Sequence, residues 1–417
     1  MDLETISSKF TTEVLDTIVR NHGGTRHKSY KFGDGFRKGD SFLSDVYRLI
    51  VTGIREDETE FELQMIIKSM PKSVSRRKTF RSAGFFRNEC CFYEVVLRKF
   101  AEFQEAKGFP DEFSRVASCY ATVVDGENDF LALEDLSRDG YKTADRTNGL
   151  DFYHCKKIMT TLGKFHAISL AIKDQEPEEF KRIVGAIEEM YYREPYRQWY
   201  EPYQIDFINV ARDAMCREYG DTMYESIMKE FTGPGFFDTM IRLVSTPGKY
   251  SVICHGDCWA PNFLLKYDAA GSVAVDSKMI DFQLARVASP ATDISFLIYT
   301  CTQQDVRENH FDELVQIYHR SVVDVLSALG SNAEEVFPFS ALQQELKNSA
   351  RFGVGMAMEA LPYCEMDDTD TPNLGEMEGD EAVPLNKILV IHPCKTKSGR
   401  LRMANTFKHA IDKGFLD

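Results

Sequence analysis

The chain has 417 residues, of which 43% are hydrophobic, so it can bury one or two sizeable cores and is not disordered as a whole. At roughly 150 residues per domain, this length fits two or three structural units or one large bilobal fold. The 50 Lys and Arg residues are outnumbered by 65 Asp and Glu residues, which gives a formal net charge of −15. No overall positive field is therefore available to hold nucleic acid or an anionic membrane surface.

The sequence also indicates the compartment. The ten cysteines are few for this length and irregularly spaced, which argues against a disulfide framework and favours a reducing compartment. The N-terminal segment MDLETISSKFTTEV is acidic and amphipathic, unlike a secretory signal. No stretch of about 18 apolar residues runs without a charge, so no membrane-spanning helix is predicted. We expect a soluble cytosolic protein, and nothing in the sequence indicates an obligate protein partner.

The first third of the chain predicts an antiparallel sheet with one helix on it. Two extended runs between Ser44 and Lys68 flank a polar bridge that opens with Gly53, a pattern typical of a β-hairpin. A helix is predicted from about Phe85 to Glu102. Two short strands, YATVV and FLALEDL, follow on either side of the turn signal DGEND. Strands of this kind around one helix are typical of an α+β unit.

Beyond Leu136 the pattern becomes mostly helical. Apolar residues spaced by three and four from Asp151 to Lys173 predict one long helix. Further helices are expected over Asp206–Met215, Asp221–Phe231, His310–Leu329 and Phe339–Met358. Short strands are predicted in SVICHGD, NFLLKY and SKMIDFQL. The predicted fold is α+β and bilobal, with an N-terminal unit of residues 1–136 and a mostly helical unit of residues 137–417 that holds a small β insertion.

One acidic segment stands apart. Residues 365–381 carry eight carboxylates and no basic residue, with Pro and Gly among them. This composition predicts a solvated loop rather than an acidic binding site.

Side chains suited to phosphoryl transfer gather in CHGDCWAPNFLLKY and MIDFQL. His255, Asp257 and Asn262 lie in a loop after a short apolar strand, and Asp281 ends a second strand. Transfer from ATP requires a carboxylate that accepts or orients the proton of the attacking hydroxyl. A second carboxylate and an amide oxygen must hold Mg²⁺ against the phosphates. Asp257, Asp281 and Asn262 supply that set, and Asp and Asn five positions apart have the spacing of the kinase catalytic loop.

The chain resembles the ecdysteroid kinase-like family of arthropods, which is related to choline kinases and aminoglycoside phosphotransferases and has a protein kinase-like fold. The resemblance covers nearly the whole chain through the order and spacing of KSMP, FFRNECCFY, LALEDL, LGKFHAIS, HGDCWAPN, IDFQ and SPATDISFL. It implies that Asp257 is the catalytic base, that Asn262 and Asp281 bind Mg²⁺, and that His255 orders the loop. Two isolated aspartates would be read as turn residues, but the ordered set of motifs is not explained in that way.

Lys68 is predicted to grip the ATP phosphates, with Glu89 as its partner. Met65 and Ile67 lie on one face of their strand, which leaves Lys68 on the other. In the following helix Glu89 falls near the middle of an apolar arc, where an unpaired carboxylate is costly and needs a facing cation. Glu94 lies across the helix, where a surface ion pair with arginine is expected. The family places its salt bridge at the same motif.

Other nucleotide contacts are expected in the loop before the hairpin and at the hinge between the units. The stretch GDGFRKGDSFLSDVYRL does not match the glycine signature of protein kinases, and in the small-molecule kinases this turn is shorter and carries serine. We therefore expect Ser41 and Ser44, with backbone amides from Gly39 to Leu43, to contact phosphate. Backbone groups of Glu134 and Leu136 are placed to pair with the adenine edge.

Two further residues are interpreted as structural support. His166 lies on the apolar arc of its helix, so a hydrogen-bonded core histidine fits better than a catalytic one, although the family also has a histidine there. Asp293 begins the helix SPATDISFLIY and is expected to cap it or to brace the catalytic loop. Cys254 and Cys258 flank His255, but no second Cys or His pair follows at ligand spacing, so zinc is not expected.

The phosphoryl acceptor is predicted to be a small hydroxylated molecule. Only LARVASPAT and a few neighbours separate Asp281 from Asp293, too few for the peptide platform of a protein kinase. Acidic and aromatic walls would favour a cationic acceptor such as choline or an aminoglycoside, whereas an apolar slot would favour a steroid alcohol. MYYREPYRQWYEPYQIDF and FGVGMAMEALPYC either line this cleft or are packed helix faces.

The resemblance implies an ATP- and Mg²⁺-dependent phosphotransferase that acts on an ecdysteroid or another lipophilic or xenobiotic alcohol. A choline- or aminoglycoside-type kinase, a nucleotide-binding pseudokinase that serves as an interaction module, and a nucleotide hydrolase remain alternatives.

Overall fold

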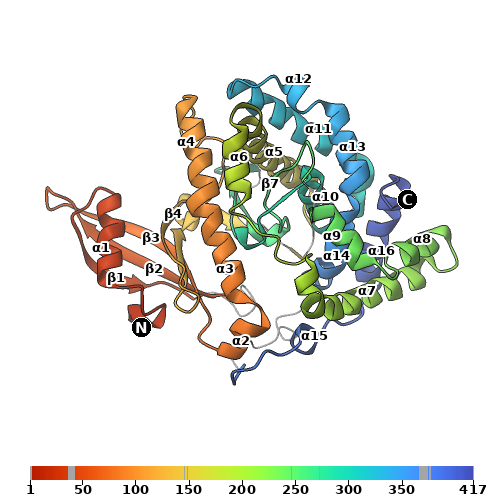
Figure 1. Ribbon diagram of the computed structural model, residues 1–417, viewed down its shortest axis with the longest axis horizontal. Coiled ribbons are helices and arrows are strands. Elements are labelled where there is room, and N and C mark those ends of the chain that lie inside the picture. The colour runs from red at the N-terminus through yellow and green to blue at the C-terminus, as the bar shows by residue number, and fades with distance from the viewer. Residues whose placement is uncertain are drawn as a thin grey trace.

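The structure, a computed structural model, describes residues 2–35, 43–144, 146–147, 149–245, 247–271, 273–365, 374 and 377–416. An antiparallel sheet from the first third of the chain lies at one side, and a larger, mostly helical part lies at the other (Figure 1). The predicted α+β class, with a sheet-bearing N-terminal part and a helical C-terminal part, is confirmed.

Among the described residues the N-terminal sheet has five strands in the order β1-β2-β3-β5-β4, and all neighbours are antiparallel. The strands are β1 (Arg26–Phe32), β2 (Asp45–Ile54), β3 (Glu60–Ser69), β4 (Cys119–Val123) and β5 (Phe130–Glu134). The hairpin predicted between Ser44 and Lys68 is confirmed as β2 and β3. β1 is an addition to the predicted elements, because its sequence RHKSYKF is mostly polar and it lies, largely exposed, at the sheet edge.

Helix α1 (Thr12–Asn21), which the sequence did not predict, covers one face of the sheet after a short turn, η1 (Leu3–Thr5). Its buried Leu15, Ile18 and Val19 share a core with Met65 and Ile67 of β3. Because side chains alternate along a strand, this packing directs Lys68 to the opposite face, where the next helix lies.

That helix runs without interruption through α3 (Ser82–Cys91), the π-helical turn η2 (Phe92–Leu97) and α4 (Arg98–Ala106), beyond both predicted ends. A shorter helix, α2 (Val74–Thr79), precedes it. The ring of Phe92, in the π turn, stacks on Phe282 with centroids 3.8 Å apart. The turn therefore fits the N-terminal part onto a loop of the C-terminal part.

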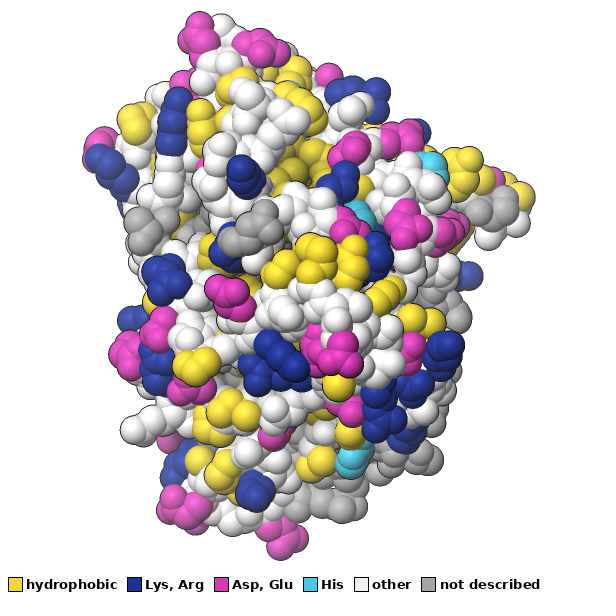
Figure 2. Space-filling model, turned by 90° about the vertical axis from the view of Figure 1, so that its right-hand side faces the viewer, with side chains coloured by type: hydrophobic (Ala, Val, Ile, Leu, Met, Phe, Trp, Pro, Cys, Tyr) yellow, Lys and Arg dark blue, Asp and Glu magenta, His cyan; other side chains and the backbone are white. Residues whose placement is uncertain are grey.

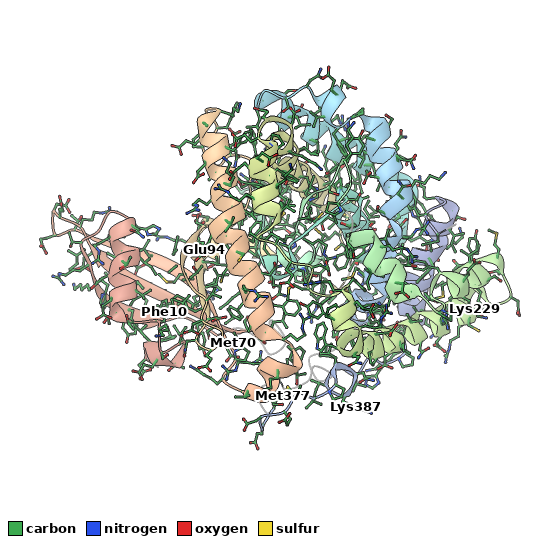
Figure 3. All side chains as sticks on the ribbon, viewed as in Figure 1. Phe10, Met70, Glu94, Lys229, Met377 and Lys387 are labelled. Atoms are coloured by element: carbon green, nitrogen blue, oxygen red, sulfur yellow. The ribbon has the colours of Figure 1, made fainter. Side chains whose placement is uncertain are left out.

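The predicted surface ion pair of Glu94 with an arginine is wrong. Glu94 accepts a hydrogen bond from Thr122 of β4, while Arg98 pairs with Glu102 at 3.8 Å. Glu94 lies on the side of the helix that faces the sheet (Figure 3). Each residue has a different partner from the one predicted, Glu94 on the sheet and Arg98 one turn further along the helix.

The C-terminal part is built mainly of helices. In chain order they are η3 (Leu136–Asp139), α5 (Phe152–Gln175), α6 (Pro177–Val184), η4 (Glu194–Tyr196), α7 (Arg197–Tyr219), α8 (Met223–Phe231), α9 (Phe236–Ser245), α10 (Pro290–Cys301), α11 (Gln304–Ala328), α12 (Ala333–Val336), α13 (Phe339–Ser349), α14 (Arg351–Cys364), α15 (Leu385–Ile388) and α16 (Lys397–Asp412). The long helix predicted from Asp151 is confirmed as α5, for which the Asp151 side chain caps the N-terminus. α7 is longer than predicted and contains Pro202.

The single helix predicted over Phe339–Met358 is instead two helices, α13 and α14. Both helices pack against α10. One straight helix over residues 339–358 could not keep contact with α10 along its whole length. Gly353 allows the close approach of α14, because a Cβ there would come within 2.2 Å of the backbone at Ser295 and Phe296.

The predicted β insertion consists of two small sheets. β7 (Val252–Cys254) pairs with β10 (Arg286–Ala288), and β8 (Phe263–Tyr267) lies between β6 (Tyr141–Thr143) and β9 (Ala274–Met279). The turns η5 (Ala260–Asn262) and η6 (Phe282–Leu284) follow β7 and β9. These strands hold the two loops that carry the predicted phosphoryl-transfer residues.

The acidic segment is only partly solvated where the structure describes it. Backbone carbonyls of Met377, Asp380 and Glu381 accept hydrogen bonds from the Ser73, Lys78 and Ser75 side chains at 2.6, 2.7 and 2.7 Å. Met377 lies beside α2 (Figure 3). The acidic side chains stay exposed while the backbone docks on the N-terminal part.

The described residues also give the state of the cysteines and the distribution of charge over one face. Within the described ranges, no helix is both long and apolar enough to cross a membrane. All ten cysteines lie within those ranges and none is in a disulfide. Figure 2 shows basic and acidic side chains interspersed over the face farthest from the sheet, rather than gathered by sign.

We predict that Gly353→Ala destabilises the fold by about 1–3 kcal/mol, because the new methyl group meets backbone atoms that cannot move aside. Gly355→Ala is the matched control on the same helix: its methyl group meets side-chain atoms of Met240 and Phe236 rather than backbone, so it should cost less. Urea unfolding of both variants measures the difference, and equal losses would contradict the explanation.

Candidate active site

The loop after β7 is held by its backbone. Gly256 has a φ of 86°, and a Cβ there would lie 1.9 Å from the carbonyl oxygen of Leu284. Only glycine fits this position, which gives a steric reason for HGD in this chain. The Asp293 carboxylate accepts hydrogen bonds from the backbone N–H groups of His255 and Gly256 at 2.6 and 3.0 Å.

His255 joins the two loops. The backbone N–H of Asp257 donates to Nδ1 of His255 at 3.2 Å, so Nε2 carries the proton and donates to the carbonyl of Ile280 at 2.8 Å. Burial lowers the pKa of His255, which keeps the ring neutral as this pattern requires. The loop of Asp257 is thereby fixed to the residue next to Asp281.

Asp257 and Asn262 lie side by side, as their spacing predicted. Asn262 Nδ2 donates to Oδ2 of Asp257 at 2.8 Å and to its carbonyl at 3.0 Å, which leaves the amide oxygen available as a ligand. Burial, followed by the negative charge of Asp281, raises the pKa of Asp257 to about 7. A carboxyl with this pKa exchanges protons near neutral pH.

Lys68 bridges the two parts of the molecule. Its ammonium donates to both oxygens of Glu89 at 2.8 and 3.0 Å and to Oδ1 of Asp281 at 2.9 Å. Burial alone would lower the pKa of Lys68, but the charges of Asp281 and Glu89 outweigh it and raise that pKa. Asp281 has a φ of 70°, an uncommon conformation for a residue other than glycine, which these contacts sustain at the start of η6.

The two support residues form a buried brace. His166 bonds to Asp293 through Nε2 at 3.1 Å and to the Tyr318 hydroxyl through Nδ1 at 2.9 Å, and it is fully buried. It is therefore a hydrogen-bonded core histidine. Asp293 was expected either to cap α10 or to brace the catalytic loop. The N-cap of α10 is Ser289, so Asp293 braces the loop. Cys254 lies close to this pair, but burial raises the pKa of its thiol and disfavours the thiolate that a metal needs.

The structure describes some, but not all, of the residues that were predicted to contact the nucleotide. Ser41 and Gly39 lie outside the described residues. Ser44 is buried, and its carbonyl accepts a hydrogen bond from Arg76 of α2 at 3.0 Å. At the hinge, the N–H of Glu134 donates to the carbonyl of Ser118 at 2.9 Å, so only its carbonyl is left for a base edge. Leu136 opens η3 directly beyond.

Spacing arguments missed a second buried ion pair beside the site. Nε of Arg286, on β10, lies 2.8 Å from Glu189, and its guanidinium lies over the ring of Phe352. Glu189 in turn accepts hydrogen bonds from the N–H groups of Tyr191 and Tyr192 at 2.8 and 2.9 Å. The pair fixes the tyrosine-rich segment to the strand that follows Asp281.

Glu359 was missed as well, although it lies in the segment FGVGMAMEALPYC. It accepts a hydrogen bond from the hydroxyl of Tyr200, and burial, then the charge of Asp257, raise its pKa to about 7. The charge of Asp257 contributes to this shift, so the Glu359 carboxyl is within electrostatic reach of the catalytic loop. An acidic residue in an otherwise apolar helix is the sequence signal that could have found it.

Asp281, beside Asp257 and Asn262 in the C-terminal part, meets Lys68 and Glu89 of the N-terminal part. With the family match that follows, this arrangement defines the protein as a small-molecule kinase. The chain belongs to the ecdysteroid kinase-like family, whose sequence profile matches residues 38–331. The resemblance stated from the motifs is confirmed.

The solved structures that are similar to this chain include two complexes. One is the GDP complex of wild-type aminoglycoside 2'-phosphotransferase-IIIa, with 13% identity over 86% of this chain and 95% of that chain, at a TM-score of 0.35. The other is the GDP and kanamycin complex of APH(2")-IIia, with 13% identity over 86% and 99%, at a TM-score of 0.36. No curated protein sequence matches the chain.

We predict that Asp293→Asn loosens the catalytic loop, because one of the carboxylate oxygens that accept from His255 and Gly256 becomes a donor. The expected loss is about 1–3 kcal/mol in unfolding free energy, with faster hydrogen exchange of the loop amides. Ser289→Ala removes the cap of the same helix but leaves the hydrogen bonds of the loop. It should therefore lower the unfolding free energy without faster hydrogen exchange of the loop amides. Equal exchange in the two variants would show that Asp293 acts only through its helix.

Proposed function

We propose that this protein transfers the γ-phosphoryl group of ATP, in a Mg²⁺-dependent reaction, to a hydroxyl group of a small molecule by direct in-line transfer. The observation that carries the proposal is the bridge from Lys68 to Glu89 and Asp281, which joins the two parts next to Asp257. This bridge needs two chain segments 213 residues apart, which is not the environment of an ordinary surface lysine. Membership in a kinase-like family supports the same conclusion.

In this proposal the lysine grips the α and β phosphates. Glu89 keeps the ammonium charged and oriented inside a dry site, and Asp281 gives up its contact with Lys68 when phosphate arrives. Serines 41 and 44 and the backbone of residues 39–43 are proposed as further phosphate contacts. The carbonyl of Glu134 and the N–H of Leu136 are proposed for the adenine edge, with the boundary between the two units after Leu136.

The donor set fits a magnesium ion. Asp281 supplies a carboxylate and Asn262 an amide oxygen, both hard ligands of the kind that Mg²⁺ prefers. When bound, Mg²⁺ offsets the negative charge of the phosphates. The imidazole of His255 does not compete for this role, because both of its nitrogens are engaged in hydrogen bonds. Burial raises the pKa of the Cys254 and Cys258 thiols, which disfavours their thiolates as ligands.

Asp257 is proposed as the group that takes or orients the proton of the attacking hydroxyl. Its pKa near 7 and its fixed contact with Asn262 suit that role. His255, Asp293 and His166 position the loop without touching the reactants. The acceptor is proposed to be a lipophilic alcohol, an ecdysteroid or a xenobiotic alcohol, and the ten free cysteines support a cytosolic location.

We predict that Asp257→Asn lowers phosphoryl transfer by at least about a hundredfold, since the amide cannot accept the proton. Asp268→Asn, a carboxylate in the β8–β9 turn, is the matched control and should leave activity unchanged. Labelled ATP with steroid, glycoside and amino-alcohol acceptors gives the rates, and mass spectrometry identifies the products. ATP consumption that is independent of every acceptor would favour a hydrolase, and Mg-ATP binding without turnover would favour a pseudokinase.

We predict that kcat/KM falls as pH decreases through about 7, because Asp257 must be ionised and its pKa is raised to that value. Above its pKa the carboxyl of Asp257 is ionised and can act as the base. Below that pKa it is protonated, so kcat/KM falls. Initial rates between pH 5.5 and 9, at subsaturating substrates, measure the profile. A rate that is flat down to about pH 5.5 would show that the pKa of Asp257 is ordinary.

A further inference from the structure

The side chain of Asn88 has no role in the proposed transfer, yet it lies where three segments of the chain meet. It is the residue before Glu89 on α3, and it is buried. Its amide nitrogen donates to the carbonyls of Gln283 and Ala285 at 3.1 and 2.9 Å. Its amide oxygen accepts from the N–H of Glu188 at 2.9 Å. Both N–H groups and the oxygen of the amide are therefore engaged.

These hydrogen bonds join distant parts of the chain. Gln283 and Ala285 lie in the loop that follows Asp281, and the bonds to them span 195 and 197 positions. The bond to Glu188 spans 100 positions. α3 lies between the N-terminal sheet and the helical part (Figure 1), and it packs against η6, the turn after Asp281. One side chain of α3 thus holds two segments of the C-terminal part.

A ring contact at the same turn supports this arrangement. Phe92, four residues after Asn88, stacks on Phe282 with 4° between the ring planes. A stack supplies apolar contact, but rings can slide over one another. Hydrogen bonds to two carbonyls require defined directions, so they set where the turn lies along the helix.

The segment at Glu188 is held to the same strand by a second contact. Nε of Arg286 lies 2.8 Å from the carboxylate of Glu189, the next residue in that segment. Arg87 also contacts the Glu188 carboxylate, at 3.0 Å, but its side chain is 60% exposed, and an exposed pair of this kind contributes little. Asn88 supplies the buried contact from α3 to this junction.

We propose that Asn88 is a positioning residue for phosphoryl transfer, which fixes the loop after Asp281 to α3 so that Asp281 and Glu89 both reach the ammonium of Lys68. This rests on the proposed function, in which Asp281 is a magnesium ligand. Asn88 acts through the backbone of the loop and not on the reactants. Groups that orient a metal ligand in this way typically change metal affinity about 10- to 100-fold when they are removed.

The test compares Asn88→Ala with Gln104→Ala, a matched control from the same continuous helix. Gln104 is also buried and also makes three hydrogen bonds. Its Nε2 donates to the Phe100 carbonyl and the Ser114 hydroxyl at 3.0 and 2.9 Å, and its Oε1 accepts from the N–H of Phe113 at 2.8 Å. These partners lie within 10 positions of Gln104, so the control loses the same kinds of contact without touching the two loops of the site.

The kinetic measurement uses Mg-ATP and the best acceptor from a panel of steroids, glycosides and amino alcohols. Asn88→Ala should lower kcat about tenfold or more and raise the Mg²⁺ concentration for half-maximal rate about tenfold. KM for ATP at saturating Mg²⁺ should change by less than about threefold, because Lys68 keeps its pair with Glu89. Gln104→Ala should change none of these values, even if its melting temperature falls. Equal effects in the two variants, or no effect in Asn88→Ala, would overturn the proposal.

Hydrogen exchange of the free protein needs neither ligand nor turnover. Asn88→Ala should speed exchange about tenfold or more at the amides of residues 282–286 and of Glu188, and Gln104→Ala at neither. Asn88→Asp keeps an oxygen that accepts from Glu188 and loses the donors to Gln283 and Ala285, so it should speed exchange at residues 282–286 alone. Unchanged exchange at those residues in both Asn88 variants would reject the positioning role.

Failure of this proposal and failure of the proposed function give different results. Transfer in wild type with the same Mg²⁺ dependence in Asn88→Ala would reject this proposal alone. Wild type that neither transfers phosphate nor binds Mg-ATP would overturn both, because Asn88 would then anchor a loop that takes part in no transfer. Thermal unfolding shows whether each variant is folded. If Asn88→Ala is not, Asn88→Asp replaces it in both measurements, with the same expected change in Mg²⁺ dependence.

Discussion

The ion pair of Lys68 with Glu89 and Asp281 is the constraint on which the rest of the site depends. Glu89 is almost fully buried and Lys68 nearly so, and neither charge could be held there without the other. Asp281 extends the pair to the C-terminal part, so one ammonium faces two carboxylates across the two parts. The remaining negative charge is of the kind that a divalent cation would balance.

Backbone geometry holds the other half of the site. Gly256 lets the loop of Asp257 pass against the carbonyl of Leu284, and Asp293 ties down two successive amides from behind. His255 then connects this loop to the one that carries Asp281. A loop held at this many points needs little reorganisation during reaction, which is the general benefit of electrostatic preorganisation.

The short connection after Asp281 has a structural consequence for the acceptor. β10 and α10 follow almost at once, and Arg286 on that strand is buried against Glu189. Where a peptide platform would need a long segment, this chain places the tyrosine-rich segment, whose Tyr191 and Tyr192 amides donate to Glu189.

Sequence patterns predicted what depends on neighbours along the chain. Strand alternation placed Lys68 opposite Met65 and Ile67, and the helical arc placed Glu89 towards the lysine. Both follow from fixed periods of two and 3.6 residues, which any tertiary context must respect. The same reasoning failed for Glu94, because its partner is Thr122 of β4, which no period within the helix can predict.

The elements outside the predictions share one property. β1 is a polar edge strand and α1 covers the sheet from outside, so neither carries a strong internal pattern. The break between α13 and α14 has no Pro or Gly at the junction and arises because both helices pack on α10. Local propensity is a weak prior in such places, since burial against a distant element decides the outcome.

The sequence by itself determined the α+β class, the order of the motifs and the five side chains proposed to handle ATP, because each lies in a short pattern with its own chemistry. Only the tertiary structure decided that Asp293 braces the loop, that Arg286 meets Glu189, and that Glu359 lies near Asp257 beside Tyr200. These contacts join residues that are far apart in the chain, 159 positions in the case of Tyr200 and Glu359. No local period encodes such a separation, so it is settled by how the helices pack.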